Sequence, residues 1–228
     1  MSRRDGFALA GSQRWLQIAV AKTPALLDAA RCRAGVISQT DSVEGVSPLA
    51  DDDFAEYRDG EVLRRLGIGR LPQRALSDFW PKRGPVWDGL GKSRHGRLIF
   101  VEAKAHIPEA ASPGSKASAA SLKRIRDSLE EARRHYAPNA TAEWSGLLYQ
   151  YANRLAFQYF FGTVNGLPTR LVFLDFCNAP DVQGPESEAE WQGATRLIHA
   201  LLGLPADLRE QGVFHAYLDV RSVAGSLE

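Results

Sequence analysis

One short segment, residues 98–106, constrains the fold most. It reads Leu-Ile-Phe-Val-Glu-Ala-Lys-Ala-His, so four apolar residues rich in β-formers precede an acid and a base two positions apart. Side chains alternate between the two faces of a strand, which puts Glu102 and Lys104 on the same face. Burying both charges is costly unless they are paired or hold a metal ion. The segment is therefore a predicted core strand that ends in a candidate functional site.

A second extended segment, residues 84–90, lies just upstream and carries Asp88. The glycines between the two segments predict a hairpin turn. A hairpin folded about residue 95 places Asp88 opposite Glu102, where two carboxylates and a lysine converge. Oxygen ligands of this kind suit Mg²⁺ or Mn²⁺. Zinc is the weaker interpretation, because no Cys or His cluster stands at ligand spacing.

At these residues the sequence resembles the PD-(D/E)XK nuclease superfamily, whose members form a metal-dependent phosphodiesterase centre from an Asp and a following Glu-x-Lys. Asp88, Glu102 and Lys104 match that motif, although Pro85 stands three residues before the aspartate and the literal Pro-Asp pair is missing. The resemblance implies an α/β fold with a restriction-endonuclease-like core in the order α-β-β-β-α-β, a mixed sheet flanked by helices. It also implies a metal held by Asp88, Glu102 and the carbonyl of Ala103. Further segments resemble an uncharacterised bacterial family within this superfamily: residues 14–17, 47–49, 56–59 and 149–155.

The resemblance implies additional site residues. Superfamily members often add an acid from the first core helix, and Glu56 is the first choice here, with Asp59 second. Gln150 and Arg154 share a helix face and are candidates to lie near the scissile phosphate. The alternatives stay open: Glu56 as a solvated acid at a helix start, and Arg154 as a residue that locks the fold.

Two further residues lie close to the motif in sequence. His106 follows Lys104 on the same strand face and is a candidate nucleic-acid contact, although a lone histidine is more often structural. Lys116 lies in a loop of small residues, 110–120, that could close over a backbone or be a plain surface loop.

Charge is distributed unevenly along the chain. The net charge is +1, yet residues 64–97 carry nine Lys or Arg against two Asp. Arg94 and Arg97 belong to this stretch, which suits a polyanionic partner. An ordinary solvated surface is the alternative.

The hydrophobic pattern predicts one domain over residues 1–228, in which an N-terminal helical extension, 1–50, packs on the core and a further helix is added near the C-terminus. Residues 36–50 are expected to be extended or looped. The predicted helices are 12–21, 24–34, 51–66, 121–136, 144–161 and 186–202, and the predicted strands are 74–80, 85–90, 97–106, 169–177 and 213–220.

These observations predict metal-dependent phosphodiester hydrolysis in nucleic acid, with DNA favoured over RNA by the resemblance. Two alternatives remain: an inactive nuclease-fold protein that binds nucleic acid as an accessory module, and a structural Glu102–Lys104 ion pair in a protein of unrelated function. The two cysteines and the lack of an apolar run of ~18 residues predict a cytoplasmic protein with no membrane partner.

Overall fold

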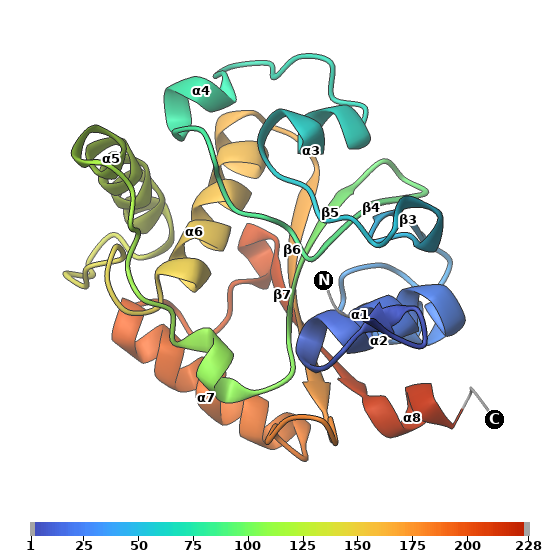
Figure 1. Cartoon of the computed structure of the whole chain (residues 1–228). Coiled ribbons are helices and arrows are strands. Elements are labelled where there is room, and N and C mark those ends of the chain that lie inside the picture. Colours follow the sequence, from blue (N-terminus) through green and yellow to red (C-terminus); the bar gives the residue numbers. More distant parts are fainter. Residues whose placement is uncertain (1–2, 226–228) are drawn as a thin grey trace.

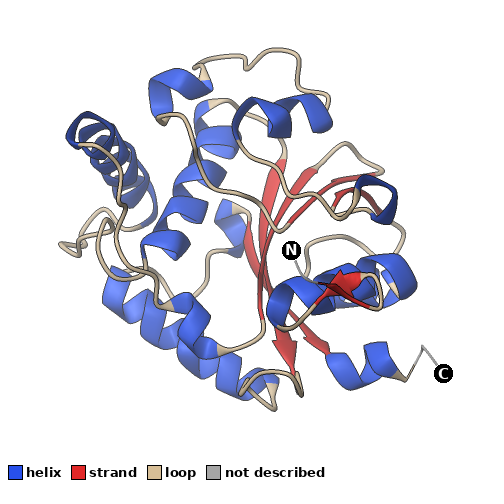
Figure 2. Cartoon of the chain, in the orientation of Figure 1, coloured by secondary structure: helices blue, strands red, loops and turns tan. Residues whose placement is uncertain are grey.

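A five-stranded mixed sheet forms the centre of the molecule (Figures 1 and 2). The computed structural model describes residues 3–225. The strands lie side by side in chain order: β3 (Val43–Ser47), β4 (Gly89–Ser93), β5 (Leu98–Lys104), β6 (Thr169–Cys177) and β7 (Val213–Asp219). The pairs β3–β4 and β4–β5 are antiparallel, whereas β5–β6 and β6–β7 are parallel. The predicted α/β class, with a mixed sheet flanked by helices, is confirmed.

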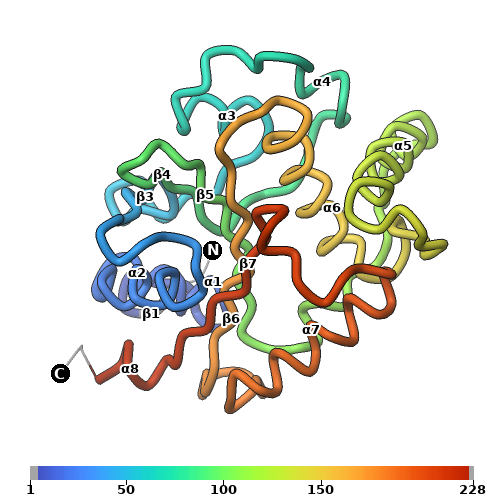
Figure 3. The backbone as a smooth tube through the Cα atoms, turned by 180° about the vertical axis from the view of Figure 1, so that it is seen from behind, coloured from blue at the N-terminus to red at the C-terminus, as the bar shows by residue number. Residues whose placement is uncertain are grey.

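One face of the sheet is covered by α1 (Gly11–Lys22), α2 (Pro24–Arg33) and α8 (Val220–Ala224). These helices pack on the odd-numbered side chains of β5, including Ile99, Val101 and Ala103. A separate two-stranded ribbon, β1 (Arg3–Arg4) with β2 (Phe7–Ala8), lies beside α1. Figure 3 shows from behind how β5, β6 and β7 run between these helices and those of the other face.

The opposite face carries α5 (Ala119–Tyr136), α6 (Tyr149–Gln158) and α7 (Glu188–Leu202). Helix α6 continues as a π-helical segment, Tyr159–Val164, and its aromatic rings pack on the sheet: the rings of Phe100 and Phe161 stack with centroids 5.0 Å apart. The short helices α3 (Asp59–Arg65) and α4 (Leu76–Phe79) extend this layer. Single 3-10 turns lie at Ala50–Asp52, Ile107–Ala110 and Arg209–Gln211.

The predicted strand at 74–80 is wrong, because that segment contains α4. Phe79 and Trp80 are adjacent in sequence and both buried, and both side chains pack on aromatic residues of α6 and its π-helical continuation. Phe79 stacks on Phe160 at 4.5 Å, and Trp80 meets the edge of Phe157. The first strand of the antiparallel trio is instead β3. It lies within residues 1–50, so that segment supplies an edge of the sheet as well as helices.

The predicted acidic helix at 51–66 begins only at Asp59. Asp53 and Phe54 both adopt φ of 54°, a left-handed conformation that ends the preceding turn. Glu56 therefore lies in a loop. The predicted 144–161 helix begins at Tyr149, after Leu148 with φ of 70°, and the predicted 85–90 strand is shifted to 89–93.

The remaining predicted elements agree with the structure to within a few residues at each end, as expected for boundaries. Strand β7 ends one residue before its predicted end, where α8 begins. Across residues 3–225 we find no helix with the length and apolar character needed to cross a bilayer.

Candidate functional site at the end of strands β4 and β5

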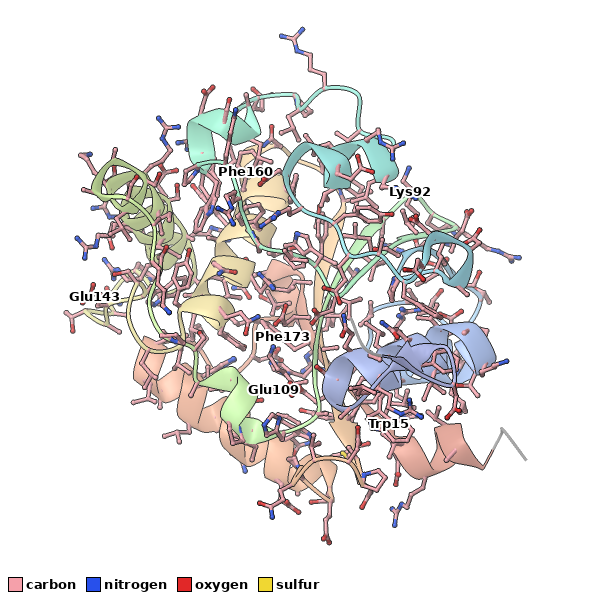
Figure 4. The ribbon with its side chains drawn as sticks, viewed as in Figure 1. Trp15, Lys92, Glu109, Glu143, Phe160 and Phe173 are labelled. Carbon is pink, nitrogen blue, oxygen red and sulfur yellow. The ribbon has the colours of Figure 1, made fainter. Side chains whose placement is uncertain are left out.

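The hairpin brings Asp88 and Glu102 to neighbouring positions. The last paired residues of β4 and β5 are Gly89 and Val101, and the same register continued by one residue sets Asp88 against Glu102. Asp88 is further fixed by its Oδ2 atom, which accepts a hydrogen bond of 2.7 Å from the backbone N–H of Ala103. The N–H and C=O of one strand residue point to the same neighbour, so the Ala103 carbonyl is directed toward Asp88. These atoms lie where β5 ends, just before the turn that carries Glu109 in Figure 4.

Glu102 is the most enclosed acid of the site, with 1% of its side chain exposed. Its Oε1 atom lies 2.5 Å from Lys104 Nζ, and its Oε2 atom lies 2.5 Å from Arg154 Nε. Burial alone would raise the pKa of Glu102, but the charges of Arg154 and Lys104 outweigh it and hold the pKa below its usual value. Glu102 is therefore ionised, with both oxygens engaged.

Arg154 acts as a clamp between two parts of the site. Besides Glu102, its guanidinium donates to the carbonyl of Val86 at 2.8 Å and to the side chain of Asn153 at 2.9 Å. It also lies 4.8 Å above the ring of Trp87. The residue is 3% exposed. Its donors thus tie α6 to Glu102 and to the segment leading into Asp88, which supports the fold-locking interpretation over direct contact with phosphate.

Lys104 is held between an acid and an amide. Its ammonium donates to Glu102 and to Gln150 Oε1, the latter at 3.1 Å. Gln150 lies in the first turn of α6, and its N–H donates to the hydroxyl of Ser112 in the small-residue loop. An ammonium has three donors, so one N–H of Lys104 remains for a further acceptor. Lys104 and Gln150 therefore lie side by side in the structure.

Glu56 reaches the same region from its loop. Its Oε1 atom accepts a 2.9 Å hydrogen bond from Gln13 of α1. Burial raises the pKa of Glu56, Gln13 partly opposes this, and the nearby charge of Glu102 adds to the rise. Asp59, the second choice, is directed elsewhere: it caps the backbone N–H groups of Arg83 and Gly84.

The carboxyl group of Asp88 has a strongly raised pKa. Burial, followed by the negative charge of Glu102, raises the pKa of Asp88 to about 8, although Lys104, Arg154 and the Ala103 N–H oppose the rise. Three carboxyl groups, those of Asp88, Glu102 and Glu56, thus interact with two cationic side chains, those of Lys104 and Arg154. The site is short of positive charge.

The donor set fits a hard divalent cation. It consists of carboxylate oxygens and the Ala103 carbonyl, the ligands that Mg²⁺ and Mn²⁺ prefer, and a cation bound at this place would oppose the rise in the pKa of Asp88 that burial and the charge of Glu102 cause. Among residues 3–225 no group of three or more His, Cys, Asp or Glu side chains is gathered in a geometry that could hold a metal ion.

Four predicted nucleic-acid contacts are not part of this cluster. Arg94 and Arg97 lie at the turn of the β4–β5 hairpin, roughly 16 Å from Glu102 along the strand, and Arg97 lies 3.6 Å from Asp41. His106 is paired with Glu109 at 2.7 Å beside the site. Lys116 is exposed in the loop before α5.

Asp175, His215 and Tyr151 were not among the predicted site residues, and they lie beside Lys104 on the side of the sheet covered by α6 and α7. Lys104 pairs with Asp175 in the parallel register, and a small cavity is shared by all four residues. A signal existed: Asp175 interrupts an otherwise apolar run in residues 171–177. No family model, curated protein or solved structure matches the chain.

Proposed function

We propose that this chain is a metal-dependent phosphodiesterase of nucleic acid, acting on DNA rather than RNA, in the cytoplasm. The observation that carries the proposal is the convergence of Asp88, Glu102 and Lys104 at the end of one hairpin, with a carboxyl group left short of positive charge. Perturbed carboxyl groups beside a lysine at a strand end are typical of catalytic sites.

The order of elements supports a restriction-endonuclease-like core. Helices α1 and α2 precede three antiparallel strands, with α3 and α4 inserted between the first and the second, and α5 and α6 then precede a strand parallel to the last of the three. This is the α-β-β-β-α-β order that the resemblance to PD-(D/E)XK nucleases implies. The site lies at the end of the third strand of this order, where the resemblance puts the Glu-x-Lys motif.

Each residue has a role that follows from its contacts. Mg²⁺ or Mn²⁺ held by Asp88, Glu102 and the Ala103 carbonyl would supply Lewis-acid stabilisation of the phosphate and an activated nucleophile at neutral pH. Lys104 stabilises negative charge as it develops on the phosphate oxygens. Gln150 orients the Lys104 ammonium through the 3.1 Å bond. Arg154 is a positioning residue, because it holds Glu102 and touches no reacting atom.

One observation favours the structural ion-pair alternative. Both oxygens of Glu102 are engaged by Lys104 and Arg154 at 2.5 Å, as in a structural ion pair. In that case these residues stabilise the fold of a protein whose function is unrelated to phosphodiester cleavage.

A cleavage assay separates these functions. Wild type should cleave linear, circular or single-stranded DNA when Mg²⁺ or Mn²⁺ is added, and Lys104→Ala should lower the rate about 10²–10³-fold, the usual cost of removing one group that stabilises the transition state. Affinity for DNA should change little, because phosphate attraction comes from many basic residues. Glu61→Gln is the matched control, since Glu61 pairs with Arg64 on the exposed side of α3.

Metal binding is measured separately by thermal shift. Mg²⁺ or Mn²⁺ should raise the melting temperature of wild type and of Glu61→Gln, because a ligand of the folded state stabilises it. Glu102→Gln should lose most of this rise. DNA binding without cleavage under either metal would favour the binding module, and neither binding nor cleavage would favour the structural ion pair.

A further inference from the structure

Three buried side chains and the partly buried His215 form an unbroken line of hydrogen bonds between the candidate site and α7. Asp175 Oδ2 lies 3.2 Å from His215 Nδ1, and His215 Nε2 lies 3.2 Å from the hydroxyl of Tyr151. The same hydroxyl lies 2.7 Å from His199 Nε2, and His199 Nδ1 lies 2.7 Å from the carbonyl oxygen of Pro205. We call Asp175, His215, Tyr151 and His199 the polar chain.

The polar chain lies between two cavities. At one end, a cavity of about 30 Å³ is lined by Glu102, Lys104, Asp175 and His215, and has room for about two water molecules. At the other end, His199 and His215 line a cleft of about 630 Å³ between α2, α7 and β7. The polar chain therefore connects the candidate site to a second opening of the molecule.

The number of protons that a fully hydrogen-bonded polar chain needs can be compared with the number that its side chains supply. Its four contacts need four protons, one in each. The Pro205 oxygen can only accept, so His199 Nδ1 must carry a proton. Two neutral imidazoles and a tyrosine supply three protons, and an ionised Asp175 supplies none. A fully bonded chain thus holds one proton more than an ionised Asp175, two neutral imidazoles and a tyrosine provide together.

The fourth proton has a preferred place. Burial lowers the pKa of His199, so its Nε2 atom accepts from the Tyr151 hydroxyl. That hydroxyl then accepts from His215 Nε2, so the fourth proton lies in the contact between His215 Nδ1 and Asp175 Oδ2. Reversing the Tyr151 hydroxyl moves the excess to His199. Tyr151 itself stays protonated, because burial raises its pKa well above its usual value.

Other charged and titratable groups surround the polar chain. They come from every neighbouring element: Glu102 and Lys104 on β5, Tyr217 on β7, Arg33 on α2, Tyr136 on α5, Glu188 and Arg196 on α7, and the Asp207–Arg209 pair after α7. Acids and bases are interspersed among them, and only Asp175 contacts His215 at ion-pair distance.

We propose that the polar chain is a proton store for the candidate site: it holds one proton beyond those of an ionised Asp175, Tyr151 and two neutral rings, carries that proton on a ring, and exchanges it through the small cavity beside Lys104. Its role in catalysis rests on the proposed function. The proton count does not, because it follows from the hydrogen-bond geometry of a chain with an ionised Asp175.

Phosphodiester hydrolysis releases one proton and consumes another, and the proton store supplies the proton that is consumed and takes up the one that is released. Water forms a bond to phosphorus and loses a proton, while the bond from phosphorus to the leaving oxygen breaks and that oxygen gains a proton. The polar chain gives its fourth proton, through water in the small cavity, to the leaving oxygen and loses one hydrogen bond. The proton released by the attacking water restores that bond.

Nuclear magnetic resonance of the ring nitrogens tests the proton count on the whole protein without metal or DNA. At about pH 7.5, one ring of the pair His215 and His199, or the two together, should carry the additional proton in wild type. Asp175→Asn should remove it, because the amide can donate to His215 Nδ1 and so complete the line with neutral rings. Tyr136→Phe is the matched control, since its buried hydroxyl has no hydrogen-bond partner in the structure.

Activity tests the catalytic role. In Asp175→Asn the cleavage rate at about pH 8 should fall about 10²-fold, the lower range for loss of acid–base catalysis, while the metal-induced thermal shift stays that of wild type. Tyr136→Phe should keep the wild-type pH profile.

The outcomes are distinguishable. Singly protonated His215 and His199 rings in wild type at about pH 7 overturn the store, whatever the activity. A doubly protonated ring together with an unchanged pH profile in Asp175→Asn overturns its catalytic role. A doubly protonated ring in a protein that cleaves nothing supports the store and counts against the proposed function.

Discussion

At the residue scale, the raised pKa of Asp88 predicts how the stability of the folded protein depends on pH. Burial and the charge of Glu102 raise this pKa to about 8, from 3.8 for an ordinary aspartate. The folded protein therefore keeps a proton on Asp88 that the unfolded chain has already lost between these two values. Without metal, stability should fall as pH rises from about 4 to about 8, because the folded state binds more protons in that window.

Thermal unfolding across this pH range checks the prediction. Asp88→Asn should flatten the decline, and saturating Mg²⁺ should do the same in wild type. Asp207→Asn is the control: Arg209 holds the pKa of Asp207 at about 2, so its contribution is complete above about pH 4 and adds no slope there. An equal decline in wild type and Asp88→Asn would show that another group is responsible.

Arg154 supplies a second prediction at this scale. Arg154→Met keeps much of the side-chain volume but leaves buried Glu102 without its Oε2 partner. Removing one member of a buried pair costs about 3–5 kcal/mol, so the free energy of unfolding in urea should fall by that amount. Arg64→Met, at an exposed pair, should stay within about 0.5 kcal/mol of wild type.

The double variant Glu102→Gln/Arg154→Met tests the cause. It removes the uncompensated charge and should regain much of the lost stability. A double variant as unstable as Arg154→Met would mean that packing of Arg154 on Trp87, rather than charge, accounts for the loss.

At the scale of elements, α7 depends on its N-terminal cap. The Ser187 hydroxyl accepts from the N–H of Glu190 and donates to its carboxylate, which in turn accepts from the N–H of Glu186. Ser187→Ala should lower the free energy of unfolding by about 1 kcal/mol, measured in urea. Ser187→Asp should retain most of it, because Asp is an equally good cap. Equal losses in both variants would count against the capping role.

The elements also show what the sequence could predict. Helices with clear apolar periodicity and the apolar strand at 169–177 were found, because their patterns have a single interpretation. Strand β3 was not, since Val-Glu-Gly-Val-Ser is short and half-buried at the sheet edge. Segment 74–80 was expected to be a strand, yet it contains α4, and its aromatic residues are buried by packing on α6 and the π-helical segment. Tertiary packing overrides local pattern at such places.

Some residues of the candidate site could likewise be predicted from the sequence, and others could not. Asp88, Glu102 and Lys104 follow from hairpin register, which is local. The clamp by Arg154 and the line from Asp175 to His199 depend on how α6 and α7 pack on the sheet, and no spacing in the sequence encodes those contacts.

At the scale of the whole molecule, the hairpin turn and the site lie apart. Arg94 and Arg97 are roughly 16 Å from Glu102 along the strand, which corresponds to about five base pairs of duplex at 3.4 Å each. A substrate that reaches both must be longer than that. The double variant Arg94→Ala/Arg97→Ala should lower the salt dependence of binding to a long duplex, with its log–log slope reduced by about 2.

Binding measured across salt concentrations, on duplexes longer and shorter than this span, checks the prediction. The cleavage rate at saturating DNA should be unchanged. Arg221→Ala removes an exposed arginine from α8, which packs with α1 on the other face of the sheet, and should leave the slope alone. An unchanged slope in the double variant would place the DNA path elsewhere.

The chain-order arrangement of the five strands has a consequence for synthesis on the ribosome. Each new strand can pair with the one made just before it, so the β4–β5 hairpin can close, with Asp88, Glu102 and Lys104 together, as soon as it emerges. Arg154 follows Lys104 by fifty residues, roughly 3–10 s of translation. During that interval Lys104 has been synthesised but Arg154 has not, so Glu102 has one of its two cationic partners. The second ion pair forms only after α6 has been made.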